Sequence, residues 1–316
     1  MLSNIPLLKP QQLHIPDGFL TPPVALFFWA LTIIIIAVAV RKTRGELGER
    51  QIPLMGIMAA FIFAAQMINF PVAGGTSGHL LGGVLAAVTL GPWAGMLVMS
   101  AVIGVQALLF QDGGLLVMGA NIFNMGLVTA LIGYGFYRSA AGRSRRVQLL
   151  VIGLAAWLSV IAGALITALQ LWLSNTSPLQ LVVPAMLGVH TVIGLGEALI
   201  TVAAIAFILQ TRPDILSASP GATTQSRGWI VGGFIAAGLV AILSPLASAN
   251  PDGLERVAED LGFIGTGIDA PYSIIPDYTL PFLGETPVST IMAGLIGIMI
   301  VAILTIGMVK ALKAKS

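Results

Sequence analysis

A histidine close to the start of the chain has a position suited to metal binding. His14 follows Leu13 and opens the tract HIPDGFL, which ends at Leu20. If the mature chain begins at Leu13, its α-amine, the backbone nitrogen of His14 and imidazole Nδ1 form two fused chelate rings in one plane. Such a nitrogen-rich, planar donor set suits Ni(II), Cu(II) or low-spin Co(II), and it does not suit Mg(II) or Ca(II). An ordinary surface histidine is the alternative interpretation of His14.

A second histidine, His79, ends a glycine-rich segment that begins at Pro71 (PVAGGTSGH). Its three glycines and the hydroxyl residues Thr76 and Ser77 let the backbone come close to another group and leave room beside the imidazole. At membrane depth, irregular backbone is tolerated only where it is buried in protein or lines a cavity. His79 is therefore a candidate fourth ligand of the chelate. A histidine that caps the start of a helix is the alternative.

Further polar residues lie within apolar stretches. His190 and Glu197 are seven residues apart, which is close to two helical turns, so both side chains lie on one helix face. An acid within a membrane span usually faces the bundle interior, where it pairs or serves a pathway. Both are candidates to support the metal ligands or to line a pathway, and a structural hydrogen-bonded pair is the alternative. Thr76, Ser77, Asn121 and Asn124 join them as candidates, although hydrogen bonds between helices explain the two amides adequately.

The composition is that of a membrane protein. Charged residues make up 9% of the chain, against about 25% in soluble domains, and hydrophobic residues make up 57%. The absence of cysteine excludes thiolate metal sites and disulfides. Nine apolar stretches are candidates to cross about 30 Å of hydrocarbon, and the third of them is short and rich in glycine. They are Val24–Val40, Ile52–Phe70, His79–Leu90, Trp93–Phe110, Gly114–Tyr137, Val147–Leu173, Leu181–Gln210, Trp229–Ala249 and Val288–Val309.

The basic residues indicate the topology. With nine alternating spans, every Lys and Arg except Lys9 and Arg256 falls on the same side of the membrane. Because positive charges concentrate in cytoplasmic loops, we expect the N-terminus outside and the C-terminus in the cytoplasm of a multi-pass protein of the inner or plasma membrane. This topology places both His14 and His79 at the outer face.

We expect an all-α, polytopic membrane helix bundle, with seven helices in a substrate-binding part and two further transmembrane helices. The expected units are an N-terminal extension at 1–12, a metal-binding transmembrane domain at 13–210, a cytoplasmic linker at 211–228 and a two-helix accessory domain at 229–316. The linker is rich in proline, serine and threonine, as flexible connectors are. The accessory domain holds an acidic outer loop at 250–287, for which metal funnelling and plain solubility both fit.

Motifs of several enzyme classes are absent. The sequence holds no G-x-x-x-x-G-K-[ST] motif, so this chain does not itself hold ATP phosphates in a P-loop, and no H-E-x-x-H motif of a zinc protease. No nucleophile and base occur at a spacing that suits intramembrane catalysis. We therefore expect a chain that is not an enzyme and has no nucleic-acid partner.

Four motifs together resemble one family of transport proteins. They are HIPDGFL at 14–20, GGTSGHL at 74–80, GANIFNMG at 119–126 and the stretch from His190 to Glu197. Their order and combination resemble the substrate-binding membrane component of cobalt and nickel energy-coupling-factor transporters, the CbiM/NikM type, over about residues 13–210. The tail, with NPDGLE at its acidic loop, resembles the two-helix accessory component of the NikN/PDGLE type, here fused to the same chain.

The resemblance implies that Ni(II) or Co(II) is the transported ligand and that no cofactor is needed. Besides the lipid bilayer, it implies a membrane coupling protein (the T component) and a pair of cytoplasmic ABC ATPases as partners. Carried over by position, it implies that His14 supplies its imidazole and its backbone nitrogen. The initiator amine would fall at Leu13, and the second imidazole would be that of His79.

The sequence departs from the family at its start, because family members begin at Met-His, whereas twelve residues precede Leu13. With those residues present, nitrogen 13 is an amide and cannot act as an amine donor. Our hypothesis is a misassigned start, since a TTG leucine codon also initiates translation. An ion-coupled secondary metal transporter without ATPases, with His190 and Glu197 as a relay, is the alternative function. The ligands do not distinguish nickel from cobalt.

Overall fold

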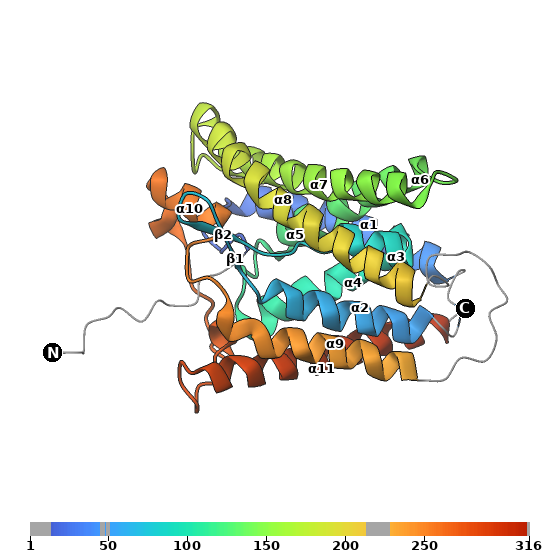
Figure 1. Ribbon diagram of the computed structural model, residues 1–316. Coiled ribbons are helices and arrows are strands. Elements are labelled where there is room, and N and C mark those ends of the chain that lie inside the picture. The colour runs from blue at the N-terminus through green and yellow to red at the C-terminus, as the bar shows by residue number, and fades with distance from the viewer. Residues whose placement is uncertain (1–13, 45–47, 49–50, 213–227, 315–316) are drawn as a thin grey trace.

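The computed structural model describes residues 14–44, 48, 51–212 and 228–314. Leu13, the extension at 1–12 and residues 213–227 of the predicted linker lie outside the described residues. The described chain is a helical bundle with one small hairpin, in which β1 pairs antiparallel with β2 (Figure 1). Its elements are α1 (Pro22–Arg44), α2 (Gln51–Gln66), β1 (Phe70–Val72), β2 (Thr76–Gly78), α3 (Gly83–Leu90), α4 (Pro92–Val105), η1 (Gln106–Phe110), α5 (Met118–Asn121), η2 (Ile122–Val128), α6 (Thr129–Ser139), α7 (Arg145–Leu173), α8 (Leu179–Thr211), α9 (Gly228–Leu243), η4 (Ser244–Leu246), α10 (Gly253–Asp260), η5 (Ile264–Thr266), η6 (Pro276–Tyr278) and α11 (Pro287–Lys313).

The helices have the length and composition of membrane spans. Among the described residues, six helical segments are long and apolar enough to cross a bilayer, and α2 is a shorter apolar helix. Large apolar side chains such as Phe27 of α1, Leu199 of α8 and Ile303 of α11 are exposed on the outside of the bundle, as lipid contact requires. The expected all-α polytopic membrane fold is confirmed. The six segments are Pro22–Arg44, Pro92–Phe110, Arg145–Leu173, Leu179–Thr211, Gly228–Leu246 and Pro287–Lys313.

The expected count of nine spans is not confirmed, and the third predicted span shows why. Of His79–Leu90, only the eight residues of α3 are helical, and they extend only about 12 Å at 1.5 Å per residue. Gly82 (φ 83°) and Gly91 (φ 84°) stand before and after α3 with positive φ angles that favour glycine and interrupt a helix. The fifth predicted span is assembled from α5, the π-helical η2 and α6 in succession.

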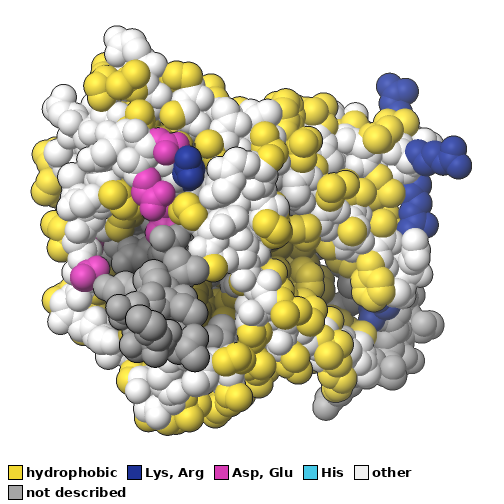
Figure 2. All heavy atoms as spheres, turned by 60° about the vertical axis from the view of Figure 1, so that its left-hand side comes forward, with side chains coloured by type: hydrophobic (Ala, Val, Ile, Leu, Met, Phe, Trp, Pro, Cys, Tyr) yellow, Lys and Arg dark blue, Asp and Glu magenta, His cyan; other side chains and the backbone are white. Residues whose placement is uncertain are grey.

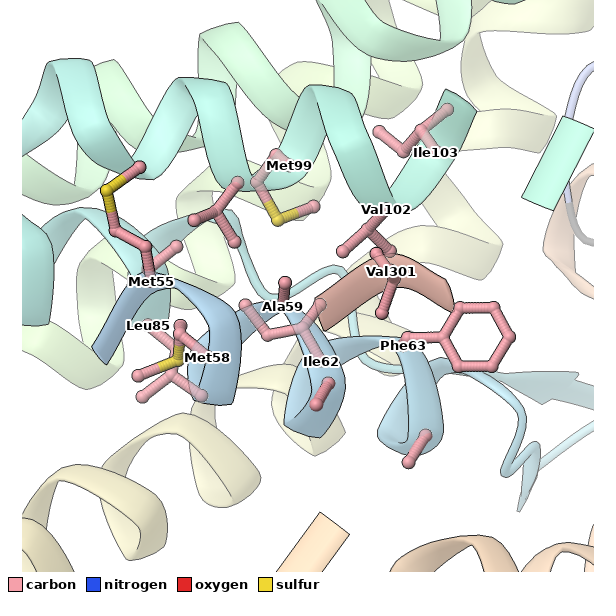
Figure 3. Close-up of a cluster of buried hydrophobic side chains, with 14 of the residues drawn as sticks. Met55, Met58, Ala59, Ile62, Phe63, Leu85, Met99, Val102, Ile103 and Val301 are labelled. Atoms are coloured by element: carbon pink, nitrogen blue, oxygen red, sulfur yellow. The ribbon is translucent and has the colours of Figure 1, made fainter. Parts of the chain in front are cut away.

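Helix α2 joins the two parts of the chain in one core. Phe63 of α2 belongs to the same buried cluster as Met99 of α4 and Val301 of α11, and Figure 3 shows these side chains together. Gly56 of α2 approaches α11 so closely that a Cβ at this position would lie 2.7 Å from the side chain of Ile306. Small residues permit such close helix contacts. Thus α9 and α11 pack against the first part of the chain and fix the segment between them over one end of the bundle.

The two ends of the bundle differ in charge. The hairpin, α10 and the start of the described chain gather at one end, as Figure 1 shows. Helix α10 carries three acidic residues, Glu255, Glu259 and Asp260, and one basic residue, Arg256. Basic residues end α1 and α11, and Figure 2 shows most of the Lys and Arg side chains in view at the far end from the acidic ones. The predicted metal ligands lie at the acidic end.

Candidate metal centre

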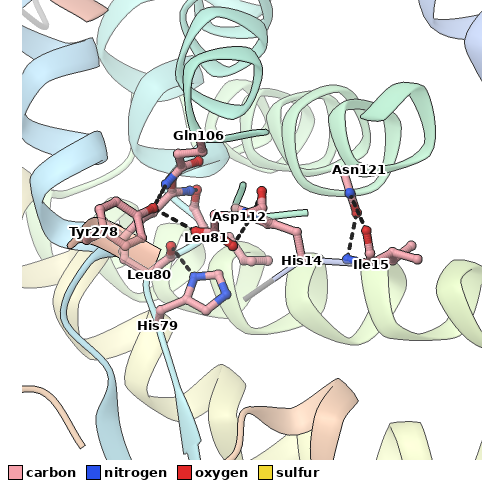
Figure 4. Close-up of polar contacts among 10 residues, drawn as sticks. His14, Ile15, His79, Leu80, Leu81, Gln106, Asp112, Asn121 and Tyr278 are labelled. Atoms are coloured by element: carbon pink, nitrogen blue, oxygen red, sulfur yellow. Dashed lines mark hydrogen bonds and ion pairs between the residues drawn. The ribbon is translucent and has the colours of Figure 1, made fainter. Parts of the chain in front are cut away.

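His14 and His79 lie side by side at the acidic end of the bundle. Their ring centroids are 5.8 Å apart and their planes cross at 78°. Both residues are buried, with exposures of 2% for His14 and 8% for His79. His14 precedes α1, and His79 directly follows β2, so the bundle brings together two imidazoles that are 65 positions apart in the chain (Figure 4).

The segment around His14 is clamped to the loop that follows η1. The Ile15 N–H donates to Oδ1 of Asn121 (3.1 Å), and Nδ2 of Asn121 donates to the Ile15 carbonyl (3.0 Å). The Asp17 carboxylate accepts from three successive backbone N–H groups at 115–117. Gly113, with φ 95°, passes so close that a Cβ would lie 2.7 Å from Cβ of His14. Asn121 therefore positions the backbone of Ile15, the residue that follows His14.

The loop that carries His79 is held from two sides. Thr76 and Ser77 donate their hydroxyls to the carbonyls of Pro251 (3.0 Å) and Asn250 (2.8 Å), in the outer segment between α9 and α11. Glu197 of α8 accepts hydrogen bonds from the N–H groups of Leu81 (2.6 Å) and Gly82 (3.1 Å). None of these three side chains lines the cavity described below. Their observed contacts position the loop.

A cavity of about 80 Å³ adjoins the two imidazoles. His190 lines it from α8, and α10 approaches so closely that a Cβ on Gly253 would lie 2.9 Å from Nε2 of His190. Asn124 also lines it, but its amide exchanges hydrogen bonds with Gln170 (2.7 and 2.9 Å). In the described ranges, no group of three or more His, Asp or Glu side chains is spaced to hold a metal ion. The polar residues at this cavity are His14, His79, His190, Asn121, Asn124, Thr167 and Asp252.

The hydrogen bonds of the imidazoles indicate which ring nitrogen carries the proton. In all three histidines Nδ1 lies within 3.0 Å of a backbone carbonyl, that of Asp112 for His14, Leu80 for His79 and Met186 for His190. A carbonyl only accepts, so Nδ1 donates and the lone pair of a neutral ring lies on Nε2. Nε2 of His14 is buried and has no hydrogen-bond partner in the described part of the chain. The fused N-terminal chelate predicted from the sequence would instead need Nδ1.

The sequence analysis missed Asp112, which is the nearest charge to His14. Oδ1 of Asp112 lies 2.9 Å from Nδ1 of His14. Burial opposes the charged form of each group, but the opposite charge and the hydrogen bond prevail, so the pKa of His14 is raised and the pKa of Asp112 is lowered. The available signal was an acid followed by two glycines in the loop after the fourth predicted span, which the predicted topology places outside.

His14 also lines a larger cavity of about 600 Å³. Carboxylates from the segment between α9 and α11 line it, and among the described residues that line it there is no Lys or Arg. Clefts lined by charge of one sign raise the local concentration of ions of the opposite sign. The arrangement therefore favours the approach of a cation to His14. The lining acids are Glu255, Asp269, Asp277 and Glu285.

Comparison with known families identifies both parts of the chain. Residues 14–215 match the family described as the cobalt uptake substrate-specific transmembrane region, CbiM. Residues 227–314 match the PDGLE domain. The first match alone covers more than half of the chain, and it includes both His14 and His79.

Individual relatives agree with these matches. A protein of Archaeoglobus fulgidus, named as a fused nickel transport protein NikMN, is 34% identical over 293 residues, which cover 92% of this chain and 95% of the relative. The fused nickel transport protein NikMN of Rhodobacter capsulatus is 29% identical over 96% of this chain and 98% of its own length. A crystal structure of a truncated transition metal transporter superposes with a TM-score of 0.56 at 35% identity, covering 62% of this chain and 98% of that one.

Proposed function

The chain belongs to the CbiM family of cobalt/nickel transport components and carries a fused PDGLE domain, and we propose that it captures metal for an ATP-driven importer. In this proposal it is the substrate-specific membrane component of an energy-coupling-factor system. His14 and His79 bind Ni(II) or Co(II) at the outer face. The chain itself performs no catalysis.

The approach of two buried imidazoles is the observation that carries this proposal. Ring centroids 5.8 Å apart leave room for one ion between two ring nitrogens, because metal–imidazole bonds are about 2.0–2.1 Å long. The cavity beside them provides space for further ligands. Imidazole nitrogens suit Ni(II) and Co(II) better than the hard cations Mg(II) and Ca(II). The α-amine of Leu13, if the mature chain starts there, would be one further nitrogen donor.

The remaining parts of the proposal concern partners and orientation. Because the sequence has no P-loop, energy would come from a pair of cytoplasmic ABC ATPases that act through a membrane coupling protein. The basic ends of α1 and α11 would face the cytoplasm. The metal-binding domain would then comprise residues 13–210, and residues 229–316 would form the accessory domain with its acidic loop outside.

The contacts of Glu197 weigh against a secondary transporter driven by an ion relay. Both carboxylate oxygens of Glu197 are engaged by backbone N–H groups, and Nδ1 of His190 bonds to the Met186 carbonyl within its own helix. A relay needs groups that exchange partners or protons. Uptake that requires ATP and the two partner proteins, and that resists a protonophore, would support the importer. Uptake by this chain alone that a protonophore abolishes would contradict it.

Metal binding to the purified full chain tests the proposed site directly. Ni(II) and Co(II) affinities are measured by isothermal titration calorimetry for the unchanged chain, His14→Ala, His79→Ala and the matched control His190→Ala. Loss of either proposed ligand should weaken binding by 100-fold or more, about 3 kcal/mol. The control should weaken it less than tenfold. Undiminished binding in both ligand variants would refute the proposed site.

A further inference from the structure

The first turn of α10 crosses the wall between the two cavities at the acidic end. Asp252 and Gly253 line the cavity of about 80 Å³ beside the imidazoles, here called the inner cavity. Glu255 lines the cavity of about 600 Å³, here called the outer cavity. Leu254, between them in the chain, lines both. Among the described residues, His14 and Leu254 are the two that line both cavities, so they form the boundary.

The backbone of this turn is held in place from several sides. Asp252 and Glu255 form a capping box, in which each side chain accepts a hydrogen bond from the backbone N–H of the other (2.7 and 3.2 Å). The Ser77 N–H donates to the Pro251 carbonyl at 2.8 Å. On the side that faces α8, a Cβ on Gly253 would meet a side chain of that helix at 2.7 Å. A passage between the cavities therefore requires a side chain to move.

The side chain of Leu254 is an apolar barrier at this boundary. Leu254 is 8% exposed and belongs to a buried apolar cluster that includes Ile15 and Phe19. A charged ion crosses an apolar contact only at a high cost in free energy, and hydrophobic constrictions control ion movement in channels for this reason. A leucine side chain can open such a contact by changing between staggered rotamers. The barrier therefore slows the passage of an ion in both directions.

The charges on the two sides of Leu254 favour the passage of a cation. The described lining of the outer cavity holds carboxylates, one of them on the neighbouring Glu255, and neither Lys nor Arg. The described lining of the inner cavity holds the carboxylate of Asp252 and likewise neither Lys nor Arg. Carboxylates that line a cavity raise the local concentration of cations. The acids therefore attract a cation to the outer side of the barrier and favour its presence beyond it.

We propose that metal ions reach His14 and His79 from the outer cavity, and that Leu254 is the residue that controls this passage. Leu254 does not bind the ion. It sets the rates of metal entry and release, and it leaves the affinity unchanged. The PDGLE domain would then control access to a site in the CbiM domain. This inference rests on the proposed function, because it assumes that the ion binds at the two imidazoles.

Substitution of Leu254 in the full chain tests the barrier. Leu254→Ala shortens the side chain that separates the cavities. Val257→Ala is the matched control, because Val257 lies one turn further along α10 and is 1% exposed, but lines neither cavity. A chromogenic chelator measures the unbound Ni(II) at successive times after mixing, which gives the association rate. An excess of the same chelator, added to the loaded protein, gives the dissociation rate.

A lower barrier raises the forward and reverse rates by the same factor. In Leu254→Ala the association and dissociation rates should therefore both rise by about tenfold or more, while the dissociation constant stays within about threefold of that of the unchanged chain. Val257→Ala should leave both rates unchanged. A role of Leu254 limited to packing would lower the stability of the protein and leave the rates of metal exchange as they are.

A block of the outer cavity tests the route independently, and it decides the question alone if Leu254→Ala does not fold. The chain has no cysteine, so a single new cysteine can be labelled selectively with a bulky neutral maleimide. Ser273→Cys introduces it at an exposed residue that lines the outer cavity. Ser139→Cys, at an exposed residue that ends α6, is the labelled control. Labelled Ser273→Cys should bind Ni(II) at least about tenfold more slowly than the labelled control.

Three outcomes would overturn the access role: unchanged rates in Leu254→Ala, a loss of affinity in that variant without faster association, or equal association rates in the two labelled proteins. Failure of the proposed function is recognised separately, because His14→Ala and His79→Ala would then bind Ni(II) normally. If the access role alone fails, those two variants are still defective, and Leu254→Ala exchanges the ion at the rate of the unchanged chain.

Discussion

Glu197 holds the backbone of Leu81, two residues beyond His79, through a 2.6 Å hydrogen bond from the Leu81 N–H to its carboxylate. The second carboxylate oxygen accepts from Gly82. An acid in the longest helix thus sets the position of the loop that carries a proposed ligand, and this loop lacks helical hydrogen bonds of its own.

Replacement of Glu197 by Gln should therefore loosen this loop. A glutamine amide offers one oxygen, so one of the two backbone N–H groups would face another donor, at a cost of about 1–3 kcal/mol. We expect a lower thermal unfolding midpoint in detergent and weaker Ni(II) binding. Glu259→Gln is the control, because Glu259 is exposed on α10. Equal midpoints for the two variants would argue against this role of Glu197.

Gly113→Ala should displace His14. The new methyl group would lie 2.7 Å from Cβ of His14 and 2.9 Å from Nδ2 of Asn121, distances that require a shift of the clamped segment. Gly142→Ala is a matched control, since Gly142 also has a positive φ (76°) but a Cβ there would meet nothing within 4 Å. We expect both variants to lose some stability. Only Gly113→Ala should lose at least tenfold in metal affinity, and titration calorimetry measures this; equal affinities would contradict the close approach.

Metal affinity should rise with pH through the pKa of His14. Burial disfavours the imidazolium, but the charge of Asp112 prevails and raises the pKa of His14 above its ordinary value of 6.5. Below that pKa, the imidazole is protonated on both nitrogens and the metal must displace a proton, so apparent affinity should fall by about tenfold for each pH unit. Titrations between pH 6 and 9 check this. In Asp112→Asn the midpoint should move to lower pH, and an unmoved midpoint would contradict the ion pair.

Rising pH should destabilise the folded outer segment. Asp252 and Glu255 form a capping box at the start of α10. Burial raises the pKa of both carboxyl groups, and the neighbouring charge of Asp252 raises that of Glu255 further. A carboxyl group whose pKa is higher in the folded state binds more protons folded than unfolded, so stability falls as pH rises above about 4.5. Thermal midpoints at pH 5 to 9 should decline, and less so in Glu255→Gln. An identical decline would exclude Glu255 as its source.

The amino-acid sequence predicts the class of this fold better than its details. Low charge and long apolar stretches suffice to identify a helical membrane protein, because a bilayer imposes these features on composition. The glycine-rich composition of the third predicted span marks it as short, but it does not give the bounds of α3, which lie at the positive φ angles of Gly82 and Gly91. A prediction made from the length of apolar stretches alone would count such a segment as a membrane span.

The candidate site is predictable in part. Histidine is rare in this chain, and topology places His14 and His79 at one end of the bundle, where they lie. Asp112 gives no comparable signal, because a single acid in a short loop has neither periodicity nor a motif. The choice between Nδ1 and Nε2 depends on which acceptor faces the ring, and that information exists only in three dimensions.

The hydroxyls of Thr76 and Ser77 bond to carbonyls that lie some 175 residues further along the same polypeptide. Since a covalent chain connects the two partners, their association is intramolecular and does not depend on dilution. If the chain were cut between residues 213 and 227, the same contacts would form only when the two fragments met in a bimolecular encounter. The fraction of molecules in which Thr76 and Ser77 make these contacts would then vary with protein concentration. Fusion therefore guarantees one PDGLE domain for every candidate metal centre at any level of expression.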